Sequence, residues 1–227
     1  MTASQRSEAQ VRHEALAVLL AEPAPSWHEV LRRLATWPAA HDPAAAIAAV
    51  EAVAHRWRPQ DRGLGRFAVH QLIHGDVGPH LRLIRALDLR PLWEVGDRPA
   101  LFERMIVAGG VRELFAFDAR YDRGDTHIEL LTAHIVGLRQ LYLGGCHVGP
   151  EGARRLAECP ALAGLQRLSL HNNVLGDAGA EALLASPHLV GLRVLNLYNN
   201  QLSAPMIERI RAAPQWRGAT VTIHNQG

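Results

Sequence analysis

The sequence is poor in cysteine and has no surplus of either charge. Its 227 residues include two cysteines, Cys146 and Cys159, and 24 basic against 22 acidic residues, for a formal net charge of +2. Two isolated thiols do not make the disulfide framework of a small secreted domain, and they favour a reducing compartment. The near balance of charge, with no run of basic residues, argues against a nucleic-acid partner.

Long apolar runs and a secretory leader are also missing. No stretch approaches the roughly 18 consecutive apolar residues of a membrane span. The apolar run from Ala15 to Ala21 follows Glu8 and Glu14 rather than a cationic segment, so it predicts an amphipathic helix and not a signal peptide. These absences predict a cytoplasmic protein with no membrane partner.

Common catalytic motifs are absent as well. The chain has no Gly-x-Ser-x-Gly elbow, no phosphate-binding loop and no Cys-x-x-Cys pair. Thirteen histidines include the cluster His70, His74 and His80 beside Asp76, and histidines four residues apart share a helix face. Because no His-Glu-x-x-His motif occurs, we expect no metal, no cofactor and no catalytic residue. A His-rich metal-binding protein is the alternative that this cluster leaves open.

What the sequence does contain is an internal repeat with a constant period. Three similar segments with the pattern Leu-x-x-Leu-x-Leu begin at Gly137, Gly164 and Gly191. A small polar residue follows at the same place in each, at Cys146, Asn173 and Asn200. Weaker copies at 84–89 and 111–116 keep the same register. A fixed period of this length is typical of repeat proteins, whose terminal units are often irregular.

The pattern resembles the leucine-rich repeat family, and a unit of this length with a helical second half resembles its ribonuclease-inhibitor-like subclass. The segments 176–179 and 185–189 also resemble bacterial repeat proteins of myxobacteria and planctomycetes. The resemblance implies an α/β leucine-rich-repeat solenoid with parallel strands on the concave face and helices on the convex face. It further implies that Cys146, Asn173 and Asn200 form a buried structural ladder that satisfies backbone groups of the turns.

The N-terminal part of the chain lacks the repeat and predicts an all-helical cap. Expected helices cover Ser7–Ala21, a segment that starts with a capping box at Ser26 and Glu29, a segment that starts at Asp42, and Gly63–His74. We therefore expect a helical region at 1–80 and repeats at 81–227. The repeats are degenerate at 81–136 and regular at 137–217, and a terminal strand at 218–227 is displaced by one residue.

The variable positions between the leucines form the candidate binding surface. Side chains alternate along a strand, so these positions face away from the core. Aromatic and arginine side chains are enriched in binding hot spots. The predicted contact residues are Phe115, Phe117, Tyr142, Arg167, Ser169, His171, Asn196 and Tyr198. For Phe115 and Phe117, packing under the N-terminal helices is the alternative.

The sequence thus predicts a non-enzymatic module for protein–protein interaction whose concave face binds a protein partner. GTPase-activating proteins of the RanGAP type use the same repeat class, so regulation of a small GTPase is the alternative, with Arg167 and Asn196 stabilising charge in the partner's active site. The terminal strand has no helix after it. Its open edge predicts either blunting by polar residues or a homodimer formed through that edge.

Overall fold

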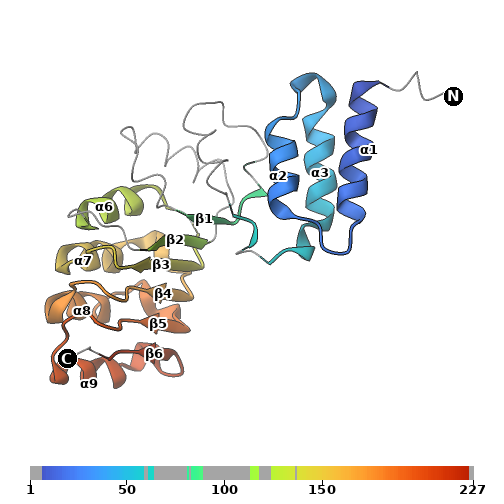
Figure 1. Ribbon diagram of the computed structural model, residues 1–227. Coiled ribbons are helices and arrows are strands. Elements are labelled where there is room, and N and C mark those ends of the chain that lie inside the picture. Colours follow the sequence, from blue (N-terminus) through green and yellow to red (C-terminus); the bar gives the residue numbers. More distant parts are fainter. Residues whose placement is uncertain are drawn as a thin grey trace. The chain divides into compact units, whose positions relative to one another are not determined.

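Contacts within the chain divide it into two units (Figure 1). The first unit holds Met1–Ala86 and Ala108–Gly110, and the second holds Leu87–Val107 and Val111–Gly227. The structure is a computed structural model that describes residues 7–58, 61–63, 81, 83–88, 113–117, 124–135 and 137–224. For residues 86–88 and 113–117 it describes the backbone alone. The predicted helix at residues 63–74 therefore lies almost wholly outside the described residues.

The described part of the first unit contains three α-helices: α1 (Glu8–Ala21), α2 (Trp27–Ala35) and α3 (Pro43–Val53). Each begins after a residue whose side chain accepts a hydrogen bond from the backbone of the first turn, and these residues are Ser7, Ser26 and Asp42. Such caps satisfy N–H groups that have no partner within the helix. The three helix starts predicted from the sequence agree with these positions.

The capping box lies at a different helix from the one expected. Ser26 accepts from the backbone of Glu29, but the Glu29 carboxylate bonds Arg32 and Arg33 instead of returning to Ser26. These bonds, from Arg33 first and then Arg32, hold the pKa of Glu29 below its usual value. The complete reciprocal box is formed by Ser7 and Gln10 at the start of α1. Two nearby guanidinium groups are stronger partners for a carboxylate than one backbone amide, which accounts for the difference.

Two tryptophans and an arginine tie the ends of these helices together. Trp27 and Trp57 meet edge to face with ring centroids 5.4 Å apart, and Trp57 Nε1 donates to the Pro25 carbonyl at 2.8 Å. Arg56 donates to the carbonyls of Leu20, Glu22 and Pro23, where α1 ends. The last carbonyls of a helix lack partners within it, so a guanidinium group there stabilises the helix end.

The described part of the second unit alternates strands and helices around one sheet, in which β2 to β6 are parallel. Its elements are β1 (Ala86–Asp88), β2 (Glu113–Phe117), α6 (Gly124–His134), β3 (Gln140–Gly144), α7 (Pro150–Glu158), β4 (Arg167–Ser169), α8 (Gly176–Leu184), β5 (Val194–Asn196), α9 (Ala204–Arg211) and β6 (Thr220–Thr222). The strands lie in the order β1-β2-β3-β4-β5-β6. Helices α6 to α9 form a second row beside the strands (Figure 1). The predicted α/β fold with a parallel sheet is confirmed.

Recurring prolines separate each helix from the next strand. Pro160 and Pro214 open short 3₁₀ turns at Pro160–Leu162 and Pro214–Trp216, and Pro187 lies just before a third at Leu189–Gly191. Because the residue before a proline avoids the helical region, each helix stops short of it and the chain returns to the sheet. Among the described residues, no helix is long and apolar enough to cross a membrane.

The sheet register follows the repeat. Leu141 pairs with Leu168 and Leu168 with Leu195, each exactly one repeat further along the chain, whereas Leu195 pairs with Val221, one position short of a full repeat. The displacement of the terminal strand by one residue is therefore confirmed, although β6 is shorter than the expected strand and residues 225–227 lie outside the description. A constant offset places equivalent residues side by side in neighbouring strands.

Leucines of the repeat fill the space between the sheet and the helices. Those at alternate strand positions are fully buried: Leu141, Leu143, Leu168, Leu170, Leu195 and Leu197. Small residues let the helices approach closely, since a Cβ on Gly179 would lie 3.2 Å from the Cβ of Ala153 on α7. The core therefore faces α6 to α9, and the opposite side of the sheet is left to the variable positions.

Candidate functional site

Strands β3 to β6 present a row of variable side chains on the side away from the helices. We call this the open sheet face, and its residues are Gln140, Tyr142, Gly144, Arg167, Ser169, His171, Val194, Asn196, Tyr198, Thr220, Thr222 and His224. Apart from Gly144 and Ser169 these residues are half-buried or exposed, whereas the leucines between them are buried. The alternation of side chains along each strand accounts for this difference.

The register aligns the open sheet face in columns. One column holds Phe115, Tyr142, Ser169, Asn196 and Thr222, and another holds Glu113, Gln140, Arg167, Val194 and Thr220. A third column includes His171 and Tyr198. It is aligned by backbone hydrogen bonds just beyond the strand ends: Gly145 N–H donates to His171 O, and Asn172 N–H donates to Tyr198 O. Neighbouring strands lie about 4.8 Å apart, so residues of one column are within reach of a single ligand.

This arrangement brings most of the expected contact residues together. Tyr142, Arg167, Ser169, His171, Asn196 and Tyr198 share the open sheet face. Phe115 and Phe117 pair with Tyr142 and Gly144 through their backbones, and their side chains lie outside the description. The choice between surface contact and packing beneath the N-terminal helices therefore stays open for these two residues.

Hydrogen bonds between neighbours hold several of these groups in place. Tyr142 Oη donates to Gln140 Oε1 at 2.6 Å, and Ser169 Oγ lies 3.0 Å from His171 Nδ1. Asn196 Oδ1 accepts from the backbone N–H of Tyr198 at 3.0 Å. A side chain already fixed in the unbound state loses less conformational freedom when a partner binds.

His171 occupies a space that exists because Gly144 has no side chain. A Cβ on Gly144 would lie 2.1 Å from His171 Cε1 and 2.5 Å from its Nε2, far inside van der Waals contact. Gly144 stands one period before His171, on the neighbouring strand. The imidazole therefore lies over the backbone of β3, with Ser169 holding its Nδ1 side.

Replacing Gly144 by alanine should move His171 without unfolding the protein. The new methyl group takes the ring's position, so the ring rotates away and its bond to Ser169 breaks, while the free energy of unfolding changes by about 1 kcal/mol or less. The NMR signal of the His171 Cε1–H group measures this change. Gly191→Ala is the matched control, since a Cβ there has its nearest contact at 3.7 Å. An unshifted His171 signal in Gly144→Ala would contradict the geometry.

Asn173 links two neighbouring repeats from within the core. Its Oδ1 accepts from the N–H groups of Cys146 at 2.9 Å and Val148 at 3.0 Å. Its Nδ2 donates to Leu143 O at 2.7 Å and Leu170 O at 2.8 Å. Every polar atom of the Asn173 side chain is thus satisfied by backbone, which is the requirement for burying an amide.

Asn200 repeats only half of this arrangement. Its Nδ2 donates to Leu170 O and Leu197 O, but its buried Oδ1 has no hydrogen-bond partner among the described residues. The equivalent position in the preceding repeat is Cys146, whose thiol donates a hydrogen bond to Gly144 O with Sγ 3.5 Å from the oxygen. The three residues occupy equivalent places with different bonding, so their contributions to stability differ.

A second asparagine column was missed in the sequence. Asn172 and Asn199 both have a left-handed backbone with φ of 55°, and Gly145 has φ of 65° at the equivalent place. Asn199 Nδ2 donates to Asn172 Oδ1 at 3.1 Å on the surface. The available signal was the recurrence of Gly or Asn, the residues that best tolerate this conformation, directly before the buried position.

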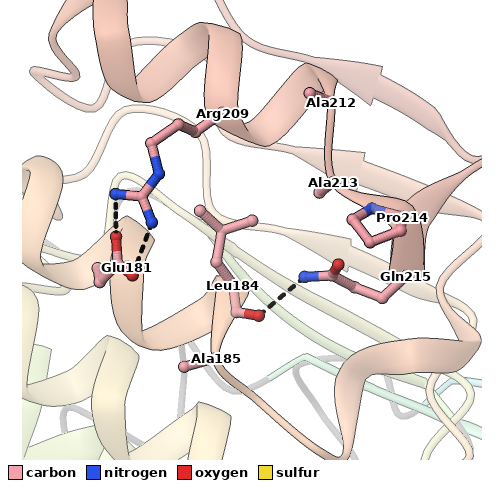
Figure 2. A pocket seen from close by; sticks show the side chains of 8 residues that line it. All are labelled: Glu181, Leu184, Ala185, Arg209, Ala212, Ala213, Pro214 and Gln215. Carbon is pink, nitrogen blue, oxygen red and sulfur yellow. Dashed lines mark hydrogen bonds and ion pairs between the residues drawn. The ribbon is translucent and has the colours of Figure 1, made fainter.

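The helix side contains a shallow pocket between α8 and α9 (Figure 2). It has a volume of about 320 Å³ and includes the Arg209–Glu181 ion pair and a hydrogen bond from Gln215 Nε2 to Leu184 O at 2.8 Å. The charged and amide groups in the pocket are thus already paired with one another. This leaves no unsatisfied polar side chain there to orient a ligand.

No group of three or more metal-ligating side chains comes together within the described parts of the chain. The cluster of His70, His74, Asp76 and His80 falls outside those parts, so the structure does not test it. Neither cysteine is in a disulfide. Burial raises the pKa of the Cys159 thiol, which keeps it in the less reactive protonated form.

Comparison with known proteins agrees with the repeat geometry. A family model described as leucine rich repeat matches residues 138–157 and 165–184, which run from β3 through α7 and from β4 through α8. A search of curated proteins gives no significant match. Repeats of this kind generally mediate protein–protein interaction. Residues 138–157 and 165–184 are thus two successive leucine-rich repeats, and the strand–helix stack continues on both sides of them.

Proposed function

We propose that this chain is a non-enzymatic interaction module that binds a protein partner through the open sheet face. The main observation in support is the pre-ordered pair of Ser169 and His171, which are hydrogen-bonded to each other. Gly144 provides the space for the imidazole. Tyr142 lies one strand before this pair and Tyr198 one strand after it. Aromatic side chains beside fixed polar groups are the usual composition of a binding hot spot.

Replacing Tyr142 and Tyr198 together by alanine should weaken partner binding at least about 100-fold, because each ring supplies hot-spot contact area. Partners are first captured from the source organism on the immobilised chain and identified by mass spectrometry, and the affinity of each is then measured with purified protein. Glu208→Ala with Arg211→Ala is the control, since it removes an exposed ion pair on α9. Unfolding curves of both variants establish that they are folded.

Two results decide the proposal. Loss of binding in the tyrosine variant alone, with both proteins folded, supports the open sheet face as the contact surface. Equal affinity of wild type and tyrosine variant for every captured protein would remove the open sheet face from the proposal.

The proposal extends to the finer architecture and setting of the protein. It includes a curved solenoid of the ribonuclease-inhibitor-like subclass, with the N-terminal helices as its cap. Two buried cysteines outside any disulfide support a reducing, cytoplasmic setting, and the resemblance of residues 176–179 and 185–189 to bacterial repeat proteins supports a bacterial source. It also retains a homodimer through β6, which is the last strand of the sheet in the described part of the chain.

A further inference from the structure

Carboxylates in the regular repeats all lie on the helices. The segment 137–224 has its acidic residues in α7, α8 and α9 alone, and they are Glu151, Glu158, Asp177, Glu181 and Glu208. The strands of this segment and the loops that connect them contain none. The two sides of this part of the protein therefore differ in charge, although the whole chain is nearly neutral.

Arginines on the helix side are neutralised by these carboxylates. Arg154 contacts Glu151 and Glu158 at 2.6 Å each, and Arg211 contacts Glu208 at 2.7 Å. Arg209 pairs with Glu181 across α8 and α9, as Figure 2 shows, and this bond raises the pKa of Arg209. The helix side thus keeps its guanidinium groups in ion pairs of its own.

The arginines of this segment that lie outside its helices have no ion pair with a described carboxylate. Arg139, Arg167, Arg193 and Arg217 are all exposed. Within the described side chains no carboxylate lies at ion-pair distance from any of these four, and Arg139 donates a hydrogen bond to Gly164 O at 3.3 Å. Arg167 stands on the open sheet face, and Arg139 and Arg193 directly precede β3 and β5.

Glu113 is the nearest acidic residue along the sheet. It pairs in register with Gln140, which in turn pairs with Arg167. Two strand spacings, or about 10 Å, therefore separate the backbones of Glu113 and Arg167. The side chain of Glu113 lies outside the description, and no described carboxylate is at ion-pair distance from Arg167, so we treat the Arg167 charge as available to a ligand.

Resting on the proposed function, we infer that the protein partner contributes an acidic segment, rich in Asp and Glu, that lies across the open sheet face. All 24 basic Lys/Arg residues of the chain are arginines, and the guanidinium fork matches a carboxylate with two parallel hydrogen bonds. Arg139 and Arg193 lie two strands apart, about 10 Å, which is the span of roughly three residues of extended peptide. Acidic residues three positions apart therefore fit this surface.

Charge complementarity of this kind acts on the rate of association and on partner choice. Exposed arginines attract an acidic segment before contact, and they disfavour a basic one. The pre-ordered tyrosine and histidine cluster then supplies contact area at the same place. The acidic segment is bound by charge at the strand starts and by side-chain packing between them.

The test is selection of a phage-displayed library of short random peptides on the immobilised full chain. Peptides that also bind the Tyr142→Ala, Tyr198→Ala variant are removed, so the remainder depend on the open sheet face. We expect Asp and Glu to be enriched in them, often three positions apart. Binding of the best peptide should fall about tenfold or more for Arg167→Glu with Arg193→Glu, and fall again on raising the ionic strength from about 0.05 M to about 0.5 M.

Two variants complete the experiment. Arg167→Lys keeps the charge without the fork and should lose only part of the affinity, whereas Arg211→Glu on the helix side should lose none. Tyrosine-dependent peptides without acidic enrichment would overturn the inference and leave the proposed function standing. Absence of any tyrosine-dependent peptide would overturn both. Binding of a single-stranded oligothymidine that requires Arg167, with no acidic peptide recovered, would replace the acidic protein segment by a nucleic acid.

Discussion

Replacing Asn173 by alanine should lower the free energy of unfolding by about 3 to 5 kcal/mol, because it leaves two buried backbone N–H groups without an acceptor. Those groups belong to Cys146 and Val148, in the preceding repeat. The carbonyls of Leu143 and Leu170 lose a donor in the same substitution. One side chain therefore supports turns in two repeats, and its removal weakens the contact between them.

Chemical unfolding in urea, followed by circular dichroism, measures this loss. Asn200→Ala is the informative comparison. It removes the hydrogen-bond donor to the carbonyls of Leu170 and Leu197, but no described N–H group loses an acceptor, because Asn200 Oδ1 accepts no bond from the described residues. Carbonyl oxygens tolerate an unfilled site better than N–H groups do, so we expect a smaller loss of about 1 to 2 kcal/mol. Arg167→Ala, at an exposed position on β4, serves as the control. Equal losses for Asn173 and Asn200 would contradict the assigned bonding.

Replacing Leu168 by alanine should cost about 2 to 5 kcal/mol, because it opens a cavity in a core that cannot close around it. Leu168 is fully buried in β4 and lies between Leu141 and Leu195 in the register. Each repeat contacts only its neighbours, so a cavity in the middle of the stack weakens the interfaces on both sides.

The same unfolding measurement tests this prediction. Arg167→Ala is the adjacent control: its side chain is exposed on the open sheet face, and a surface substitution changes stability by about 0.5 kcal/mol or less. A cost below about 1 kcal/mol for Leu168→Ala would show that the surrounding leucines move in and fill the cavity, which would contradict the prediction.

The repeat part of the fold could be predicted because its signal recurs. Leu168 and Leu195 are buried for the same reason and at the same spacing, so each copy supports the interpretation of the other. Pro160 and Pro214 likewise mark two returns of the chain to the sheet. Even the shorter offset at Val221 was visible, since an apolar residue stood one place early in the pattern.

The candidate site was less accessible to sequence because it depends on pairs of residues in different repeats. Nothing within residues 140–144 indicates that Gly144 makes room for an imidazole, and the effect appears only when His171 is placed beside it. The separation of carboxylates from Arg167 and Arg193 has the same origin. The net charge of +2 counts residues without regard to the helix or strand that contains them. The separation of acidic helices from basic strands is therefore not visible in that total.

Local competition explains the difference at the N-terminal helices. Ser26 and Glu29 have the spacing of a capping box, but Arg32 and Arg33 stand one turn further on and take the carboxylate. Ser7 and Gln10 form the box because the amide side chain of Gln10 carries no charge that would draw it towards a guanidinium group. A capping motif is therefore interpreted together with the charges of the following turn.

The constant offset between repeats has a consequence for how such a chain changes in evolution. From β3 to β5 every strand is displaced by one full repeat from the one before, and Asn173 satisfies only its own and the preceding repeat. Duplication of one whole unit therefore leaves each older side chain on the same face with the same neighbours on at least one side. A gene for this protein can lengthen or shorten by whole units, and the number of contact positions changes in steps while the scaffold stays the same.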